Sequence, residues 1–328
     1  MLQIWQNAPT SGNPTQTLPA NAIGQITVNG SDGNDTLVLD YLNGAFASAD
    51  SITFNAGNGA NDSLQLVGSS GTDAVQLAGS NLFIGNLPVP FTAAESLRID
   101  TAGGDDTLNV NTTSPAFAFI SGAGTDRLTI NGGVTPIAAD LGASGDVVAL
   151  HVHNDAVGNL NASQNLASLT LTGFAKANVT TGDNKVLRTS ALSLGQASTL
   201  DLTNNDLTLE YTGTSPLPAV QSLINTARNA GAWDGPGITS SAARNRSPKN
   251  TTLGVIDSGA SSVLVKYTYY GDSDFNGVVN FDDYARIDNG FSTNKTGWAN
   301  GDFDANAAIN FDDYSLIDLA FNTQIEGL

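Results

Sequence analysis

Apolar and polar residues alternate in short stretches along most of the chain, and each stretch ends at a cluster of Gly, Asn, Asp or Ser. A period of two residues is typical of half-buried β-strands, and such clusters are typical of turns. The clearest alternation lies between residues 166 and 211, at Leu169, Leu171, Leu192, Leu194, Leu200, Leu202, Leu207, Leu209 and Tyr211. A last alternating run, from Val263 to Tyr269, leads directly into Gly271. The pattern predicts a mainly β protein.

A short motif recurs up to about residue 197, in which a turn is followed by Asp, one spacer residue and an apolar residue. Its copies begin at Asp35, Asp62, Asp73, Asp106, Asp126 and Asp146. The last three copies are 20 residues apart, while the earlier gaps are 27, 11 and 33 residues. Units of this length suit the coils of a parallel β-solenoid, in which each coil buries its face on the next. The alternative is a β-sandwich, whose strands recur at about 8–12 residues.

The Gly-Asp turns superficially resemble the calcium-binding repeats of secreted toxins, which have a nine-residue period. That tandem period is absent from this sequence. Gly supplies the positive φ that a corner needs, and Asp can cap its own backbone there. We therefore expect these turns to be structural corners rather than calcium sites.

One segment has helical spacing. After Pro216 and Pro218, apolar residues fall on one helix face, at Val220, Leu223, Ile224 and Ala227. The loop that follows contains Trp233, which we expect to be a packing corner rather than a ligand site. We divide the chain into a solenoid-like region (1–197), a β-rich connecting module with one short helix (198–270) and a C-terminal module (271–328).

Residues 271–294 and 301–324 form an internal repeat with an offset of 30 residues and no gap. The first copy begins Gly271-Asp-Ser-Asp-Phe-Asn-Gly-Val-Val-Asn-Phe-Asp-Asp-Tyr284. The second begins Gly301-Asp-Phe-Asp-Ala-Asn-Ala-Ala-Ile-Asn-Phe-Asp-Asp-Tyr314. This spacing is that of a twelve-residue calcium loop, which takes oxygen ligands from positions 1, 3, 5, 7 and 12.

Each copy supplies one set of calcium ligands. In the first loop they are Asp272, Asp274, Asn276, the backbone carbonyl of Val278, and Asp283. In the second loop they are Asp302, Asp304, Asn306, the backbone carbonyl of Ala308, and Asp313. Position 6, where the chain turns sharply, is Gly277 in the first loop and Ala307 in the second. A residue other than Gly is disfavoured at positive φ, so we expect two calcium ions with weaker binding at the second site.

A helix is expected after each loop. Apolar residues lie at helix-face spacing in both copies, at Phe281, Tyr284, Ile287 and Phe291, and at Phe311, Tyr314, Ile317 and Phe321. We expect the two helices to pack these stripes together, with calcium as part of what folds so small a unit. Asp at position 12, with no clear helix before either loop, resembles dockerin rather than calmodulin.

The charge supports a cation. The formal net charge is -19, from 31 acidic and 12 basic residues, and residues 271–328 contribute 11 acids against two bases, or -9. Few bases disfavour nucleic acid and anionic membrane surfaces as partners. Cysteine is absent, so there is no disulfide framework or zinc–thiolate site. No apolar run approaches the length of a membrane span, and residues 1–20 are not signal-like, so we expect an exported form to have lost its signal.

Residues 198–324 resemble a module common in large exported, adhesin-like proteins of planctomycetes and related bacteria. The resemblance rests on three segments, Leu200-Asp-Leu-Thr-Asn-Asn-Asp-Leu-Thr-Leu-Glu-Tyr211, the Gly-x-Trp-x-Gly-x-Gly-Ile loop at 231–238, and Val265-Lys-Tyr-Thr-Tyr-Tyr-Gly-Asp272. It implies an architecture rather than a reaction, and an extracellular or cell-surface location.

Dockerins that bind cohesin place recognition residues at loop positions 10 and 11, often small hydroxyl residues. Here these positions are Phe281-Asp282 and Phe311-Asp312, so the surface differs from the usual cellulosomal type. Two partners for the module therefore stay open. One is a cohesin-like protein, and the other is the chain's own upstream solenoid, reached through the strand that ends at Tyr270.

We expect no enzyme activity. Solenoid lyases use an Arg or Lys base and hydrolases use clustered carboxylates, whereas Arg98, Arg127 and Lys176 are far apart in sequence and the Asp residues sit at turns. His151 and His153 share one strand face, and we expect them to be incidental.

The favoured function is a non-catalytic extracellular structural, adhesive or scaffold-attached protein with a calcium-ordered end. One alternative is the C-terminal part of a polysaccharide-degrading enzyme, which a groove lined by aromatic and carboxylate side chains would favour. A further alternative is a fibre subunit that self-associates through open sheet edges.

Overall fold

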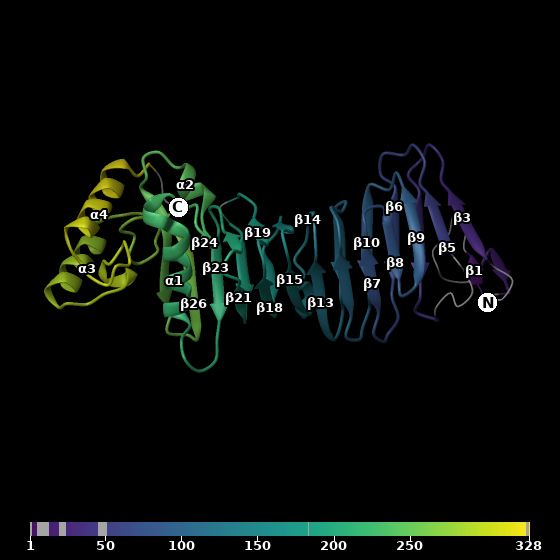
Figure 1. Ribbon diagram of the computed structural model, residues 1–328, viewed down its shortest axis with the longest axis horizontal. Coiled ribbons are helices and arrows are strands. Elements are labelled where there is room, and N and C mark those ends of the chain that lie inside the picture. The colour runs from purple at the N-terminus through teal and green to yellow at the C-terminus, as the bar shows by residue number, and fades with distance from the viewer. Residues whose placement is uncertain (1, 5–12, 20–23, 45–50, 183, 326–327) are drawn as a thin grey trace. The chain divides into compact units, whose positions relative to one another are not determined.

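The computed structural model describes residues 2–4, 13–19, 24–44, 51–182, 184–325 and 328. The chain is mainly β, with 39% strand and 16% helix, and forms a β-solenoid of about eight turns followed by a few helices (Figure 1). The predicted fold class is confirmed, and the β-sandwich alternative is wrong because most neighbouring strands pair in parallel. The chain divides into two compact units, residues 1–158 and 159–328.

The unit of residues 1–158 contains two sheets of stacked coils. Within it, one sheet has the strand order β14-β12-β10-β6-β4 and the other has the order β15-β13-β11-β7-β8-β9-β5-β3. Neighbours are parallel except in the hairpins β7–β8 and β8–β9. The elements are β1 (Leu2–Ile4), β2 (Gln16–Leu18), β3 (Gln25–Asn29), β4 (Thr36–Asp40), β5 (Ser51–Asn55), β6 (Ser63–Val67), β7 (Ala74–Leu77), β8 (Asn81–Ile84), β9 (Leu87–Thr92), β10 (Ser96–Asp100), β11 (Thr107–Val110), β12 (Phe117–Ile120), β13 (Thr125–Ile130), β14 (Val134–Ile137), the 3-10 helix η2 (Ala143–Gly145) and β15 (Val147–Val152).

The core of this unit is built from aliphatic side chains in register on successive coils. Leu108 on β11 pairs with Leu128 on β13, which pairs with Leu150 on β15, and all three are fully buried. Burying one such side chain contributes about 1.5–3 kcal/mol. The alternating sequence pattern therefore buries one face of every strand, and the turns between strands are left to polar residues.

The unit of residues 159–328 continues with short coils and ends in an antiparallel hairpin. Its strand orders are β24-β22-β19, β21-β18 and β17-β20-β23-β26-β25, and β25 and β26 are antiparallel to their neighbours. The strands are β17 (Gln164–Leu166), β18 (Ser168–Leu171), β19 (Lys176–Val179), β20 (Val186–Thr189), β21 (Leu192–Leu194), β22 (Thr199–Asp201), β23 (Asp206–Glu210), β24 (Gly237–Thr239), β25 (Thr251–Asp257) and β26 (Ser262–Tyr269), and β16 (Val157–Leu160) lies at the boundary of the units.

The helix predicted after Pro216 is α1 (Leu217–Arg228), which packs on β24 and β25 and buries Val220, Ile224 and Ala227 (Figure 1). It is followed by η3 (Asn229–Gly231) and later by α2 (Ser241–Asn245). Trp233 is buried, and its carbonyl accepts a hydrogen bond from the Thr239 hydroxyl at 3.1 Å. The prediction that Trp233 is a packing corner is thus confirmed.

The last elements are α3 (Phe281–Ser292), η4 (Trp298–Asn300) and α4 (Phe311–Thr323). Asn280 and Asn310 start α3 and α4 with a capping box, in which the side chain at the third helical position bonds back to the cap. Among the described residues, no helix is long and apolar enough to cross a membrane.

The predicted packing of the aromatic stripes is wrong in part. Ile287 and Ile317 are fully buried, but Phe281 and Phe311 are each 82% exposed and Phe291 is 57% exposed. The stripes do meet at their aromatic rings, since Phe321 contacts Phe281 and Tyr284, and Tyr314 contacts Phe291. The buried cluster around Ile287 and Ile317 is completed by residues outside the stripes, namely Tyr269, Tyr270, Val279, Trp298 and Phe303.

Candidate metal centre

Two groups of three Asp residues in the C-terminal module have the geometry of metal sites. One group is Asp272, Asp274 and Asp283, and the other is Asp302, Asp304 and Asp313. In each group, one carboxylate oxygen per residue lies within 4.8 Å of the others, so each group could hold a metal ion. These are positions 1, 3 and 12 of the two predicted loops, so the structure brings together the residues that the sequence spacing selects.

The Asp at position 12 closes each loop onto the helix that follows it. Asp283 accepts hydrogen bonds from the Ser273 amide (2.8 Å) at Oδ1 and from the Asn280 amide (2.9 Å) at Oδ2. Asp313 does the same with the amides of Phe303 (2.7 Å) and Asn310 (3.0 Å). Both loops are therefore pre-folded around a carboxylate that also starts a helix.

Asp272 ties the first loop to the preceding strand. It is fully buried, and its two oxygens accept hydrogen bonds from the amides of Asn276 and Gly277, each at 3.0 Å. The hydroxyl of Thr268, which lies on β26, also donates to Asp272. A residue of the sheet thus contacts the first triad directly.

The second triad contains an unsatisfied atom. Asp302 is 4% exposed, and its Oδ1 is buried with no hydrogen-bond partner among the described residues. A buried carboxylate oxygen without a partner is costly, and a bound cation would satisfy it.

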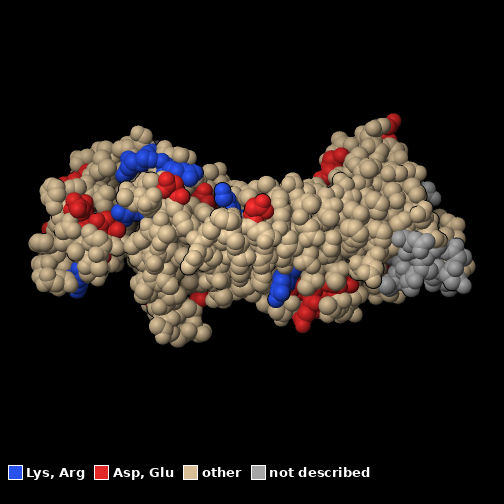
Figure 2. Space-filling model, in the orientation of Figure 1, with Lys and Arg blue, Asp and Glu red and all other residues tan. Residues whose placement is uncertain are grey.

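Electrostatics favour a cation at both triads. Burial raises the pKa of Asp272, Asp302 and Asp313, and neighbouring Asp charges raise it further. Among the described residues, the only ion pair to either triad joins Arg286 to Asp274 at 3.9 Å. Figure 2 shows acidic side chains on the module, with a strip of basic side chains on the neighbouring elements.

The remaining predicted ligands lie in the same loops. The side-chain oxygens of Asn276 and Asn306 accept hydrogen bonds from the amides of Val278 and Ala308, each at 2.9 Å. At position 6, φ is 86° for Gly277 and 69° for Ala307. The turn therefore needs positive φ in both loops, and only the first has the residue that adopts it without strain.

Residues that sequence reasoning missed join the module to the hairpin β25–β26. The ammonium group of Lys266 on β26 donates to the Phe275 carbonyl at 2.9 Å. Within the module, Trp298 Nε1 donates to the Asp272 carbonyl at 2.8 Å and so fixes the ring that faces β25. The rings of Phe275 and Trp298 also lie over Gly254 on β25. A lone Gly in a strand is a sign of close approach, which is the one signal the sequence offered.

Other contacts reach the same module from α1 and from the loop before β25. The guanidinium of Arg228 donates to the Phe303 carbonyl at 3.3 Å, and the side chain of Asn250 donates to the Thr323 hydroxyl at 3.0 Å. At the end of α4, the Gln324 amide pairs with the backbone of Val279, at 2.8 and 2.7 Å.

The other sequence candidates form no comparable site. Arg98 pairs with Asp100 at 2.7 Å, Arg127 lies on β13, and Lys176 belongs to the other unit. His151 and His153 are edge to face with ring centroids 5.8 Å apart, and burial lowers the pKa of His151.

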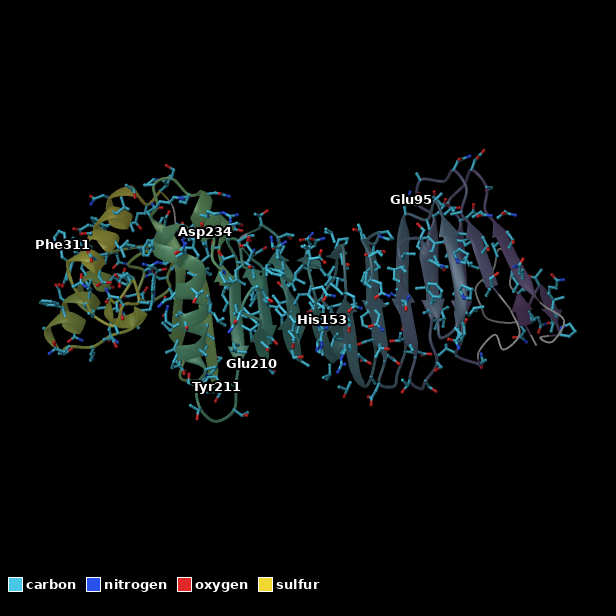
Figure 3. All side chains as sticks on the ribbon, viewed as in Figure 1. Glu95, His153, Glu210, Tyr211, Asp234 and Phe311 are labelled. Carbon is cyan, nitrogen blue, oxygen red and sulfur yellow. The ribbon has the colours of Figure 1, made fainter. Side chains whose placement is uncertain are left out.

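An open hollow of about 500 Å³ is lined by Arg188, Glu210 and Tyr211 among others. Glu210 and Tyr211 are labelled in Figure 3. The one carboxylate of the hollow, on Glu210, faces Arg188 at 3.4 Å. Glycoside hydrolysis needs a pair of carboxylates, so the hollow lacks the groups for that reaction.

Comparison of the chain with protein-family models, with curated proteins and with solved structures found no match. The functional inference therefore rests on the geometry of the site.

Proposed function

We propose that the chain is a non-catalytic, extracellular structural protein whose dockerin-like C-terminal module binds two calcium ions and caps its own β-solenoid. The observation that carries this proposal is the duplication of the Asp triad, each copy closed onto the start of a helix. Two sites built alike at an offset of 30 residues argue for a shared ligand rather than for two chance clusters of acids.

The donor set favours calcium. Every candidate ligand is an oxygen, from carboxylates, Asn side chains and backbone carbonyls, and the chain has no cysteine and no histidine near the triads. Oxygen-only sites rich in carboxylates suit hard cations, and a flexible loop with several ligands suits calcium better than magnesium. The high negative charge of the module is then balanced by the ions.

The contacts to β25 and β26 support a capping role. Thr268 on β26 donates to Asp272, and the ring of Trp298, whose Nε1 donates to the Asp272 carbonyl, lies over Gly254 on β25. An ion that orders the first loop therefore also orders the surface by which the module packs on the strands. Covering the last strands would shield a sheet end from pairing with another chain.

A cohesin-like partner is the second candidate, favoured by the exposure of Phe281 and Phe311 at position 10 of each loop. Phe311 lies on the outside of α4 (Figure 3). The two roles use different faces of the module, so capping leaves these rings free.

The test is calcium binding by the full chain and by two matched variants. Asp274→Asn with Asp304→Asn removes one charge from each triad, while Asp282→Asn with Asp312→Asn removes the same charge from exposed neighbours outside the triads. We expect the first variant to bind two fewer ions per chain and the control to bind as many as the parent. Each saturated site should stabilise the fold by about 2.7 kcal/mol when calcium is 100 times Kd. Equal stoichiometry in all three proteins would exclude the triads as the sites.

A further inference from the structure

Three Asp residues of the first unit lie in line on successive coils. Strand pairing places Thr107 opposite both Ala74 and Arg127, so the residues before them, Asp73, Asp106 and Asp126, are also in register. Neighbouring strands are about 4.8 Å apart. Asp106 and Asp126 therefore form a stacked pair at one corner of the solenoid.

Each carboxylate of this pair uses only one of its oxygens. Asp106 Oδ1 accepts a hydrogen bond from the Asp73 amide at 2.7 Å, and Asp126 Oδ1 accepts one from the Asp106 amide at 2.9 Å. The expectation that such residues cap their own turn is wrong here, because the amide comes from the neighbouring coil. The Oδ2 atoms of both residues are buried without a partner among the described residues, and both side chains are only 1% exposed.

A third buried oxygen lies in the same turn. Ser121 begins the turn that leads into β13, whose second residue is Asp126; Ser121 is fully buried, and its hydroxyl has no partner among the described residues. Thr101 holds the equivalent place one coil earlier; its hydroxyl donates to the Ser121 carbonyl at 3.2 Å, and its interaction with Asp106 lowers the pKa of that carboxyl against the larger effect of burial. Ser121 precedes Asp126 by the same five residues, and no hydrogen bond joins the two side chains. Two neighbouring coils therefore present three unsatisfied oxygens.

No basic side chain balances this pair. In the part of the chain that the structure describes, no ion pair includes Asp106 or Asp126. Further acids flank them, since Asp73 adds to the field at Asp106 and Asp126 adds to that at Asp146. Burial and the charge of Asp126 raise the pKa of Asp106, and a cation close to both buried carboxylates would favour their charged forms.

We propose that the Oδ2 atoms of Asp106 and Asp126, with the Ser121 hydroxyl, bind a calcium ion that bridges two adjacent coils of the solenoid. Calcium–oxygen bonds of 2.3–2.6 Å span about 4.6–5.2 Å across the ion, which includes the spacing of neighbouring strands. Magnesium, with bonds of about 2.0–2.1 Å, spans only about 4.2 Å and would require the coils to move together. This site is independent of the two triads of the C-terminal module.

The test starts from the full chain with Asp274→Asn and Asp304→Asn, so that calcium binding by the module does not obscure the result. In this background we compare Asp106→Asn with Asp126→Asn, which keeps the oxygen that accepts the amide and removes the charges. Asp105→Asn, an exposed neighbour in the same turn, is the control. We expect equilibrium dialysis to find one calcium ion per chain in the background and the control, and none in the double variant.

Ser121→Ala keeps both carboxylates and should weaken binding at least about tenfold. If the double variant does not fold, as judged by circular dichroism, Ser121→Ala decides, and an unchanged affinity overturns the proposal. If the background protein binds no calcium, the proposal is overturned. This holds also if its melting temperature varies with pH because Asp106 and Asp126 share a proton instead of a calcium ion. None of these results changes the expected loss of two calcium ions when Asp274 and Asp304 are replaced in the parent protein. The proposal for the C-terminal module and the proposal for the solenoid can therefore fail separately.

Discussion

The contact between the module and β25 can be tested by one added methyl group. A Cβ atom at Gly254 would lie 2.6 Å from both Phe275 Cε1 and Trp298 Cε2. Carbon atoms pack favourably at about 3.5–4.0 Å, so Gly254→Ala requires the two rings to move by about 1 Å. The backbone of Gly254 does not have positive φ, so the clash is the main effect of the substitution.

The rings have little room to move. Trp298 is 5% exposed, its Nε1 is bonded to the Asp272 carbonyl, and its ring lies 5.1 Å from that of Phe303. Overpacking of such a site costs about 1–3 kcal/mol. Because Trp298 holds the backbone of the loop that carries the first Asp triad, we expect this cost to appear in calcium binding as well as in stability. A coupling of 1–3 kcal/mol corresponds to about a 5–150-fold loss of affinity.

Isothermal titration with calcium and protection of residues 271–328 from protease measure the two effects. Gly71→Ala is the matched control, because Gly71 lies in an exposed turn where the nearest atom to an added Cβ is the Ser69 hydroxyl at 3.8 Å. We expect Gly254→Ala to weaken the first site and to expose the module to cleavage, while the control behaves as the parent. If Gly254→Ala matched the parent in both assays, the module would not pack on β25, and the capping role would be wrong.

Two further predictions concern the triads. Ala307→Gly relieves the strain of positive φ at position 6 of the second loop. A gain of about 1 kcal/mol in the free energy of calcium binding should tighten that site about fivefold in a calcium titration. Equal affinity of the variant and the parent at the second site would contradict its predicted weakness. Burial raises the folded-state pKa of Asp272, Asp302 and Asp313 above that of the unfolded chain. Their contribution to the stability of the calcium-free protein is therefore complete below about pH 4 and is lost as pH rises through the raised values. Calcium-free melting temperatures should thus rise as pH falls from 7 toward 4 while calcium affinity falls, and a calcium-free protein that loses stability throughout that range would contradict these shifts.

The sequence predicts features whose chemistry is local. The twelve-residue spacing places Asp272, Asp274 and Asp283 on one loop, and the structure brings their carboxylates together. The helix after Pro216 and the alternation of buried residues are equally local, since each depends on a period of residues within one element.

Features that depend on tertiary contacts were missed. Nothing near Gly254 in the sequence indicates that Trp298, 44 positions later, lies over it. The exposure of Phe281 could not be predicted from the sequence for the same reason. Helical spacing places Phe281 on the apolar face of its helix, but it does not show that Trp298 and Phe303 are part of the buried cluster beside that helix. Likewise, the motif at Asp126 predicts a turn, whereas the amide it binds belongs to the neighbouring coil.

The shortage of basic residues applies both to the solenoid and to the C-terminal module. Residues 1–97 contain no Lys or Arg, and the whole chain has 12 basic against 31 acidic residues. Among the described residues, no ion pair includes the buried carboxylates of Asp62, Asp106 or Asp302. Under the assignments proposed above, calcium takes the place of those missing bases at a solenoid corner and at the C-terminal cap. Sodium chloride screens exposed charges but acts much less on buried pairs. The stability of this protein should therefore depend on calcium at concentrations at which added sodium has little effect.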